Sequence, residues 1–289
     1  MGLRLKFNLV LVLVFAAGLA LAGVVSRRIL EQNALDEVVR SAELMRGAAL
    51  AVRTYTNDQV TPQLDLQLMR TFLPQAIPAY AAAETFNALR EQHREYSYKE
   101  AVLNPTNPRD RAQEWEADLI HQFRSDPGLK EFHGTRQTPT GLSLYLARPI
   151  KVADPSCLRC HSTPDVAPAS MVKLYGESNG FGWKVGEIVG AQIVSVPMTV
   201  PLAKADEAFR TFLTSLLAVF VLAFVVLNVT LSVVIIRPVI QMSGAADQVS
   251  TGNFEVPEFV ATKKDEIAIL ATSFNRLRRS LQQAMKLLE

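Results

Sequence analysis

Leu142-Ser-Leu-Tyr-Leu-Ala-Arg-Pro-Ile-Lys-Val152 and Gly186-Glu-Ile-Val-Gly-Ala-Gln-Ile-Val-Ser-Val196 are the two stretches that decide the fold of this 289-residue chain. Both are rich in residues that favour β-structure, and Gly or Pro residues bound them, which predicts two strands of a sheet. The segments that precede them show helical patterns instead. We therefore expect an α+β domain in which helices pack on an antiparallel sheet.

Helical spacing of apolar residues marks three segments before the strands. These segments are Ile29–Gln59, Ala79–Glu91 and Arg111–Phe123. Proline disfavours the interior of a helix, so we expect Pro62, Pro74 and Pro78 to break the chain between the first two helices. We expect Tyr96–Pro108 to be extended and to end in the turn-rich Asn104-Pro-Thr-Asn-Pro108.

The most specific motif lies between the two strands and uses both cysteines of the chain: Cys157-Leu158-Arg159-Cys160-His161. A Cys-x-x-Cys-His sequence is typical of c-type haem attachment, because two thiols reach the vinyl groups of one porphyrin while the adjacent imidazole binds the iron. We predict one covalent haem c per chain, held by Cys157, Cys160 and His161. A disulfide or half of a zinc site would not require the histidine, and a zinc site would want further paired ligands.

Two apolar stretches are long enough to cross a membrane. Residues 9–25 are 17 residues without a charge, and residues 212–236 are 25 such residues. Ala20-Leu21-Ala22 resembles a signal-peptide cleavage site, but the apolar run exceeds the length that a signal peptide needs. We therefore expect two transmembrane helices, with cleavage of the first as the alternative.

Basic residues beside the spans predict the orientation, because Lys and Arg in short flanking segments stay in the cytoplasm. Arg4, Lys6 and Arg237 place both ends of the chain there, whereas Arg27 and Arg28 oppose this orientation. Covalent haem attachment normally takes place outside the cytoplasmic membrane, which supports it. The predicted layout in a bacterial inner membrane is a cytoplasmic N-terminus (1–8), a span (9–25), a periplasmic domain (26–208), a second span (212–236) and a cytoplasmic tail (237–289).

Four segments of the outer domain resemble those of a known family: Ile77-Pro-Ala-Tyr-Ala-Ala-Ala-Glu-Thr-Phe86, Tyr98-Lys-Glu-Ala-Val-Leu-Asn-Pro-Thr-Asn-Pro108, Thr138-Pro-Thr-Gly-Leu-Ser-Leu-Tyr-Leu-Ala-Arg-Pro149 and Asn179-Gly-Phe-Gly-Trp-Lys-Val-Gly-Glu-Ile-Val-Gly190. Roughly residues 40–200 resemble the periplasmic c-type-haem sensor domains long classed as a domain of unknown function. The resemblance implies a PAS-like fold around one covalent haem, with Cys157, Cys160 and His161 as attachment residues and the four segments as pocket walls. It implies no defined ligand or reaction.

A second axial ligand opposite His161 has several candidates. No third cysteine exists, which excludes a thiolate from the first helix. The remaining donors are Met45, Met171, His93, His121 and His133. Met45 ranks first because it lies on the apolar face of the first helix, although methionine also fills cores. Because no strong donor stands out, we expect the position opposite His161 to be weak or exchangeable. Arg53, Arg136 and Arg148 are candidates for pairing with haem propionates, or are plain surface residues.

The tail after the second span carries two amphipathic segments joined by an extended connector. The first opens with Pro238, and the second has apolar residues on unbroken a and d heptad positions, the pattern of a parallel coiled coil. These positions are Ile267, Leu270, Phe274, Leu277, Leu281, Ala284 and Leu288. Pro238, Gly252-Asn253-Phe254, Asp265-Glu266-Ile267 and Phe274-Asn275 resemble a HAMP linker, in which Glu266 would cap the second helix. The alternative is a plain helical hairpin.

A HAMP linker works as a dimeric parallel four-helix bundle, so the resemblance implies a homodimer. The complete expectation is a PAS-like antiparallel-sheet sensor domain between two transmembrane helices, followed by an all-α HAMP helix pair. The sequence ends at Glu289, without the roughly 100 residues that a kinase or cyclase domain needs. We therefore expect output through a separate cytoplasmic signalling protein, unless the sequence was cut.

Three functions from different classes fit these features. The preferred one is a receptor whose haem senses redox state or a small diatomic ligand and relays the change through the HAMP linker. The alternatives are a membrane-anchored monohaem cytochrome for electron transfer and a small-molecule chemoreceptor with a structural haem. A net charge of +2 gives no nucleic-acid footprint. We expect no enzyme activity, because no nucleophile–base pair, phosphate loop or paired-carboxylate motif stands out.

Overall fold

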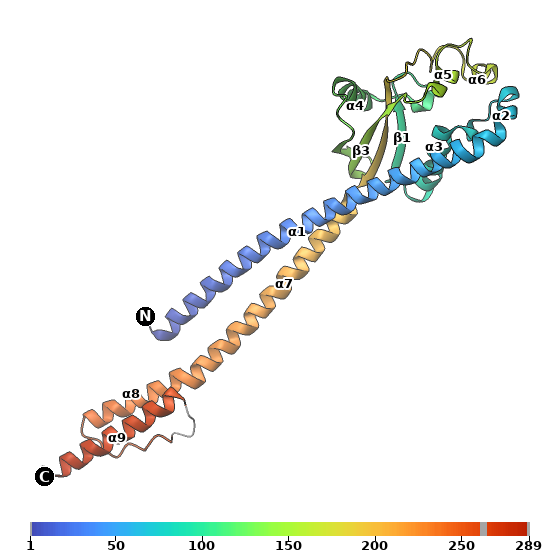
Figure 1. Ribbon diagram of the computed structural model, residues 1–289. Coiled ribbons are helices and arrows are strands. Elements are labelled where there is room, and N and C mark those ends of the chain that lie inside the picture. The colour runs from blue at the N-terminus through green and yellow to red at the C-terminus, as the bar shows by residue number, and fades with distance from the viewer. Residues whose placement is uncertain (1, 261–264, 288–289) are drawn as a thin grey trace. The chain divides into compact units, whose positions relative to one another are not determined.

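The structure is a computed structural model that describes residues 2–260 and 265–287. It divides into two compact units (Figure 1). One unit is formed by Arg27–Ala208 and contains the sheet. The other combines Met1–Ser26 with Phe209–Glu289, so both ends of the sequence belong to it.

A four-stranded antiparallel sheet forms the centre of the first unit (Figure 1). Its strands are β1 (Ser97–Val102), β2 (Phe132–Thr138), β3 (Gly141–Lys151) and β4 (Ile188–Pro197), in the order β1-β4-β3-β2. The two strands that the sequence predicted are β3 and β4, which pair with each other in register from Ser143↔Pro197. The α+β class with an antiparallel sheet is therefore confirmed, and β1 begins the segment that was expected to be extended.

Helices account for most of the rest of the chain. They are α1 (Leu3–Tyr55), α2 (Thr61–Arg70), α3 (Pro78–Gln92), α4 (Glu114–Ser125), α5 (Leu158–His161), α6 (Ala169–Tyr175), α7 (Thr199–Thr230), α8 (Arg237–Ser250) and α9 (Glu266–Lys286). Short 3₁₀ turns lie at Pro74–Ala76, Pro108–Asp110 and Pro155–Cys157. The three helical segments predicted before the strands correspond to α1, α3 and α4.

The prediction that Pro62 breaks the first helix was wrong. A π-helical turn, η1 (Thr56–Val60), connects α1 to α2, and Pro62 lies in the first turn of α2. Proline in a helix lacks an N–H and clashes with the carbonyl one turn earlier, and a wider π turn before it accommodates both effects. The Thr61 hydroxyl lies 2.9 Å from the Thr56 carbonyl and 2.7 Å from the Ala76 carbonyl, which fixes this junction.

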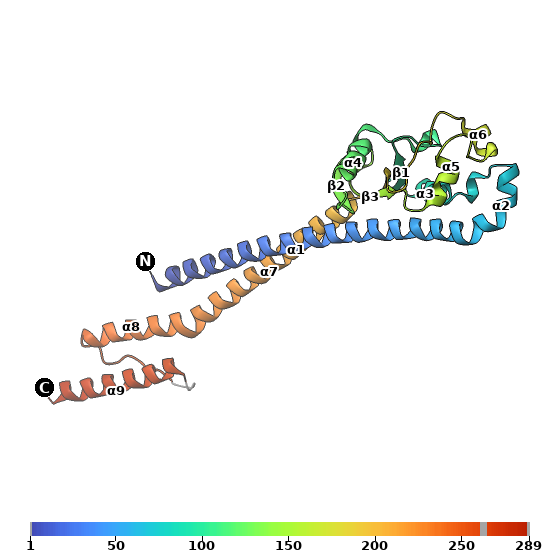
Figure 2. The ribbon, with the colours of Figure 1, turned by 45° about the horizontal axis from the view of Figure 1, so that its top comes forward.

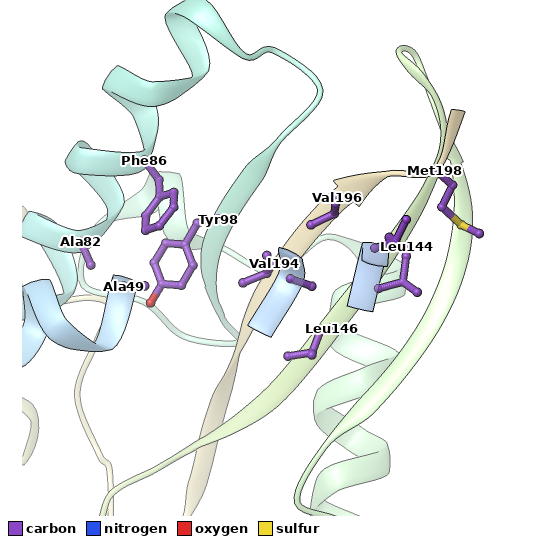
Figure 3. Close-up of a cluster of buried hydrophobic side chains, with 11 residues drawn as sticks. Ala49, Ala82, Phe86, Tyr98, Leu144, Leu146, Val194, Val196 and Met198 are labelled. Atoms are coloured by element: carbon purple, nitrogen blue, oxygen red, sulfur yellow. The ribbon is translucent and has the colours of Figure 1, made fainter. Parts of the chain in front are cut away.

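Each face of the sheet has its own core, because side chains alternate along a strand. We call the first the α1-side cluster; it joins α1, α3 and the sheet (Figure 3). Its buried members are Val38, Ala42, Ala49, Ala82, Phe86, Tyr98, Leu144, Leu146, Val194, Val196 and Met198. The α4-side cluster covers the other face with Ala101, Leu119, Ile120, Phe123, Ala147, Ala191 and Ile193. The sheet is therefore sandwiched between helices.

The apolar stretches predicted to cross a membrane are helical. Residues 9–25 lie within α1 and residues 212–236 within α7 and the π-helical η5 (Leu231–Ile236). Both helices are long and apolar enough to span a membrane. In the unit that holds these stretches, Phe15 stacks on Phe220 with ring centroids 4.8 Å apart.

The tail folds as α8, a connector and α9. Val256 of the connector packs with Ala245 and Val249 of α8, and Phe254, Phe259 and Phe274 surround them. The Asn275 amide exchanges two hydrogen bonds with the Phe259 backbone, donating at 2.8 Å and accepting at 3.0 Å. These bonds fasten the connector to α9.

The expectation that Glu266 caps α9 was wrong. Asp265 is the N-cap, and its carboxylate accepts a 2.9 Å hydrogen bond from the Ala268 N–H. Glu266 follows as the first residue of the helix and is exposed. An Asp side chain is short enough to turn back onto the first free amides, which explains its preference for this position. Leu288, the last predicted heptad position, lies outside the described residues.

We predict that Leu146→Ala lowers the free energy of unfolding of the sheet unit by about 2–5 kcal/mol, because Leu146 is fully buried in the α1-side cluster. Unfolding can be followed by fluorescence, since Trp115 and Trp183 are the two tryptophans of the chain and both lie in this unit. The control is Leu66→Ala on α2, where the side chain is 80% exposed and the cost should stay near 0.5 kcal/mol. Equal effects would contradict this assignment of the core.

Candidate functional site

The Cys-x-x-Cys-His motif forms a short helical turn on a loop between β3 and β4. Asp154 caps the 3₁₀ turn Pro155–Cys157 by accepting a 2.8 Å hydrogen bond from the Ser156 N–H, and α5 follows directly. This turn brings Cys157, Cys160 and His161 within one compact segment. Both cysteines are free and half-buried, so their thiols remain accessible to a reactant.

The His161 ring is held by one strong hydrogen bond. Its Nδ1 lies 2.7 Å from the Gly180 carbonyl oxygen. A carbonyl oxygen only accepts, so Nδ1 carries the proton and donates it, and Nε2 is left with a free lone pair. Metal-binding histidines are commonly oriented by such a bond on the other ring nitrogen. His161 is therefore in the tautomer that binds a metal through Nε2.

Stacking against Trp183 fixes the orientation of the His161 ring. The indole stacks on the imidazole with centroids 3.8 Å apart and an interplanar angle of 10°. The backbone reinforces this contact, because the Trp183 N–H donates to the His161 carbonyl at 3.1 Å and the Gly182 N–H donates to the Ser162 carbonyl at 2.8 Å. The loop before β4 thus clamps the end of α5.

A second loop, residues 103–111 after β1, contacts both His161 and the loop before β4. Asn104 accepts a 3.3 Å hydrogen bond from the Gly180 N–H and donates one of 3.4 Å to the Phe181 carbonyl. The Thr106 hydroxyl lies 3.4 Å from His161 Nδ1. Two of the four segments that carry the family resemblance therefore meet at His161. The sequence did not single out these individual residues; the only hint was their place in those segments.

Burial adjusts the ionisation of the motif. It lowers the pKa of His161, against a smaller opposing effect of the Gly180 carbonyl, so the ring is neutral at neutral pH. It also raises the pKa of the Cys160 thiol, which Arg159 only partly offsets. Both shifts keep these groups uncharged.

The other candidate axial donors lie on other helices and strands of the domain. Met45 packs against the α1-side cluster on α1, and Met171 is buried on α6, whereas the ring contacts of His161 come from Thr106, Gly180 and Trp183. His93 and His133 are more than half exposed beside Glu95 and Glu131. His121 is exposed on α4 at a surface depression. No group of three or more His, Cys, Asp or Glu gathers into a metal site within residues 2–260 and 265–287.

The three arginines proposed for haem propionates all have protein partners. Arg53 reaches from α1 to Glu100 on β1, where the buried carboxylate also accepts a 2.6 Å hydrogen bond from the Tyr98 hydroxyl. Arg136 lies over the Trp115 ring at 4.0 Å, and Arg148 pairs with Glu131. Burial and the Glu100 charge raise the pKa of Tyr98, so its hydroxyl stays protonated and donating. Arg53 is therefore a structural residue that joins α1 to the sheet.

The helix after the motif contacts the helix that continues α1. The Ser170 hydroxyl on α6 donates a 2.9 Å hydrogen bond to the Leu68 carbonyl on α2. Phe72 and Tyr175 meet edge to face, with centroids 5.9 Å apart. Figures 1 and 2 both show α6 beside α2. The motif is thus connected to α2 as well as to the sheet.

These features define a mixed helix and sheet domain between two apolar helices that are long enough to span a membrane, followed by a two-helix tail. The chain belongs to the Tll0287-like family, whose sequence profile matches residues 31–197. A HAMP domain profile matches residues 231–283. Both resemblances inferred from the sequence are confirmed.

Curated relatives include the Heme sensor protein HssS of Staphylococcus aureus strains JH9 and Newman, each 36% identical over 90 residues. The match covers 31% of this chain and 20% of each relative, so the chain spans a fifth of their length. The solved structure of the cyanobacterial heme-protein Tll0287 is 19% identical, with a TM-score of 0.41 over 56% of this chain and 94% of that one.

We predict that Gly180→Ala destabilises the sheet unit more than Gly182→Ala does. Both glycines have a positive φ, +85° and +80°, so any side chain costs roughly 1 kcal/mol there. Only at Gly180 would a Cβ meet the Thr106 backbone, 2.8 Å from its N and Cα, whereas nothing lies within 4 Å at Gly182. Denaturant unfolding measured by tryptophan fluorescence should separate the two. An equal loss would show that the Gly180–Thr106 contact is not tight.

Proposed function

We propose that this chain is a membrane-bound haem receptor, in which a periplasmic domain detects redox state or a small diatomic ligand and a HAMP domain relays the change across the membrane. Cys157 and Cys160 hold one haem c by thioether bonds, and His161 binds its iron. The protein acts as a homodimer, without catalysis of its own, on a separate cytoplasmic signalling protein. It lies in a bacterial inner membrane with both chain ends in the cytoplasm.

The observation that carries this proposal is the hydrogen bond from His161 Nδ1 to the Gly180 carbonyl. This bond places the proton on Nδ1 and leaves the Nε2 lone pair available to a metal, and Trp183 fixes the orientation of the ring. Two free thiols precede it at the spacing that haem attachment requires. The donor set of this segment therefore fits a c-type haem.

A bound haem supplies an iron that changes oxidation state and accepts diatomic ligands. The contribution of this chain is to hold the imidazole in one orientation and to keep it neutral. The position opposite His161 would be weakly filled or exchangeable, and Met45 on α1 is the first candidate donor for it. Its position in the α1-side cluster would let ligand exchange act on the helix that continues into the first span.

Relatives support the sensory role. The HssS proteins that match part of this chain are named heme sensors. A HAMP domain beyond the second span is expected of a signalling protein. An electron-transfer cytochrome would have no use for it.

The tail supports the homodimer. In the single chain, α9 buries Ala268, Ala271, Asn275 and Arg278 against its own connector and α8. Its a/d residues Leu270, Leu277 and Leu281 are left 42–58% exposed. Burying such a stripe against the helices of a second copy contributes about 25 cal/mol per Å² of apolar surface.

We predict that full-length protein, made with a functioning cytochrome c maturation system, retains haem on a denaturing gel. Cys157→Ser combined with Cys160→Ser should abolish the haem stain, because both thioether bonds are lost. His161→Ala should change the absorption spectrum of the remaining haem. His133→Ala is the matched control, since that histidine is 55% exposed on β2 and should leave stain and spectrum unchanged.

Absence of stain from the wild type would exclude covalent haem. Carbon monoxide added to the reduced protein then separates the two kinds of signal. A changed spectrum indicates a site open to diatomic ligands, and an unchanged one indicates a closed site that reports redox state, with Met45→Ala the variant that should open it.

We predict that a cysteine at Leu270 cross-links two copies and that one at Ala271 does not. Leu270 is 49% exposed on the a/d stripe, whereas its neighbour Ala271 is buried within its own chain. The yield of Leu270→Cys dimer in membranes should differ between oxidised and reduced haem. Equal yields at the two positions would argue against the bundle, and a yield insensitive to haem state would favour the electron-transfer alternative.

A further inference from the structure

Residues 103–111 contact the surroundings of His161 at one end and α3 at the other. We propose that this loop is a coupling segment. Through it, the ion pair between Glu84 on α3 and Arg109 of the loop adjusts the hydrogen bonding of His161, and the state of His161 acts on α3. The proposal rests on the haem-binding function proposed above. It assigns a positioning role to Thr106 and a remote tuning role to Glu84.

The first half of the loop belongs to the His161 environment. Asn104 bonds twice to the Gly180–Phe181 backbone, and these bonds hold the carbonyl that accepts the His161 proton. The Thr106 hydroxyl, 3.4 Å from Nδ1, is a second and weaker acceptor for the same proton. Movement of this half of the loop therefore changes how strongly His161 Nδ1–H is bound.

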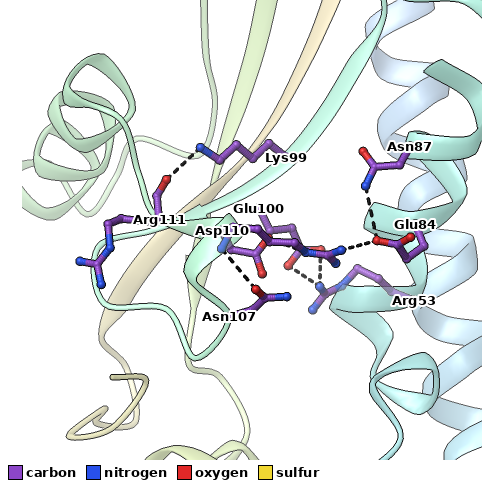
Figure 4. Close-up of polar contacts among 9 residues, drawn as sticks. Arg53, Glu84, Asn87, Lys99, Glu100, Asn107, Asp110 and Arg111 are labelled. Atoms are coloured by element: carbon purple, nitrogen blue, oxygen red, sulfur yellow. Dashed lines mark hydrogen bonds and ion pairs between the residues drawn. The ribbon is translucent and has the colours of Figure 1, made fainter. Parts of the chain in front are cut away.

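The second half of the loop is attached to α3. Arg109 pairs with Glu84 and with its neighbour Asp110, and its guanidinium lies 4.3 Å from the centre of the Tyr80 ring. Glu84 and Tyr80 are one turn apart on α3, so both side chains can contact the Arg109 guanidinium at the same time. Figure 4 shows Glu84 on α3 facing the segment that carries Asn107 and Asp110.

Hydrogen bonds brace the middle of the loop. Asn107 caps the 3₁₀ turn Pro108–Asp110 by accepting a 3.2 Å hydrogen bond from the Arg109 N–H. Lys99 on β1 donates a 2.9 Å bond to the Arg111 carbonyl, and Arg111 bonds to Asn179 beside Gly180. A loop that is held at both ends and braced between them transmits displacement instead of absorbing it.

Through α3, the loop is connected to α1, the helix that contains the first span. Ala82 and Phe86 of α3 pack with Ala49 of α1 in the α1-side cluster. Since α1 is one helix from Leu3 to Tyr55, a shift of α3 acts on the helix that enters the membrane. Such coupling is reciprocal: if the state of His161 biases α3, a change on α3 must bias His161.

Because the coupling is reciprocal, it can be tested by changing a residue on α3 and measuring the effect on the haem bound through His161. A hydrogen bond from Nδ1–H makes imidazole a stronger donor to iron and favours the oxidised state. In haem-loaded, full-length protein in detergent, Glu84→Gln should loosen the Arg109 end of the loop and raise the midpoint potential. Glu91→Gln is the matched control, because Glu91 is exposed two turns further along α3 and loses the same charge. Thr106→Val removes the hydroxyl acceptor and should also raise the potential.

The double variant Glu84→Gln/Thr106→Val distinguishes coupling from a simple field effect. If the loop carries the effect, Glu84→Gln shifts the potential less in the Thr106→Val background than in the wild type. Amide hydrogen exchange of residues 78–92 should also differ between oxidised and reduced wild type, and this difference should be lost in Glu84→Gln. Unfolding midpoints of the variants check that the fold is intact.

Equal shifts in Glu84→Gln and Glu91→Gln, or the same Glu84→Gln shift in both backgrounds, would overturn the coupling role while the haem assignment stands. A wild type that takes up no haem would overturn the proposed function itself. The two failures are therefore distinguishable.

Discussion

The site depends on one hydrogen bond, from His161 Nδ1 to the carbonyl of Gly180. It fixes the tautomer, and the tautomer decides whether Nε2 can bind a metal. The bond requires Gly180 to sit against the Thr106 backbone with a positive φ, a place that no side chain could occupy. The Cys-x-x-Cys-His sequence thus provides the donors, and tertiary structure decides how they are presented.

The sheet order explains why these contacts form. β1 and β4 are antiparallel neighbours, and Val102 at the end of β1 pairs with Gly190 near the start of β4. The loop that follows β1 and the loop that precedes β4 must therefore lie at the same end of these two paired strands. One carries Asn104 and Thr106, and the other carries Gly180 and Trp183. Pairing of two strands far apart in sequence creates the support for His161.

The sequence predicted β3, β4, the main helices and the motif, because each has a local pattern of its own. β2 was missed, since Phe132–Thr138 contains Gly, His, Arg and Gln and has no β-rich run. The contacts that orient His161 could not be predicted from the sequence either. Thr106 and Gly180 lie 55 and 19 residues from it, and strand pairing brings them together. The same holds for Arg53, whose partner Glu100 is 47 residues away. The prediction for Pro62 failed because a π-helical turn before a proline lets the helix continue.

A similar distinction between local and tertiary constraint applies to α9. Asn275 and Arg278 bond to the connector through Phe259, Val256 and Glu258, so α9 and the connector move as one body. Rotation of α9 against its own connector would break these bonds, and buried polar groups are costly to leave unpaired. The apolar face carries no such directional bonds, and packing of that kind can exist in more than one arrangement of similar energy. Any switching of the tail in the proposed dimer therefore takes place between the two copies and leaves the packing of α9 on its own connector unchanged.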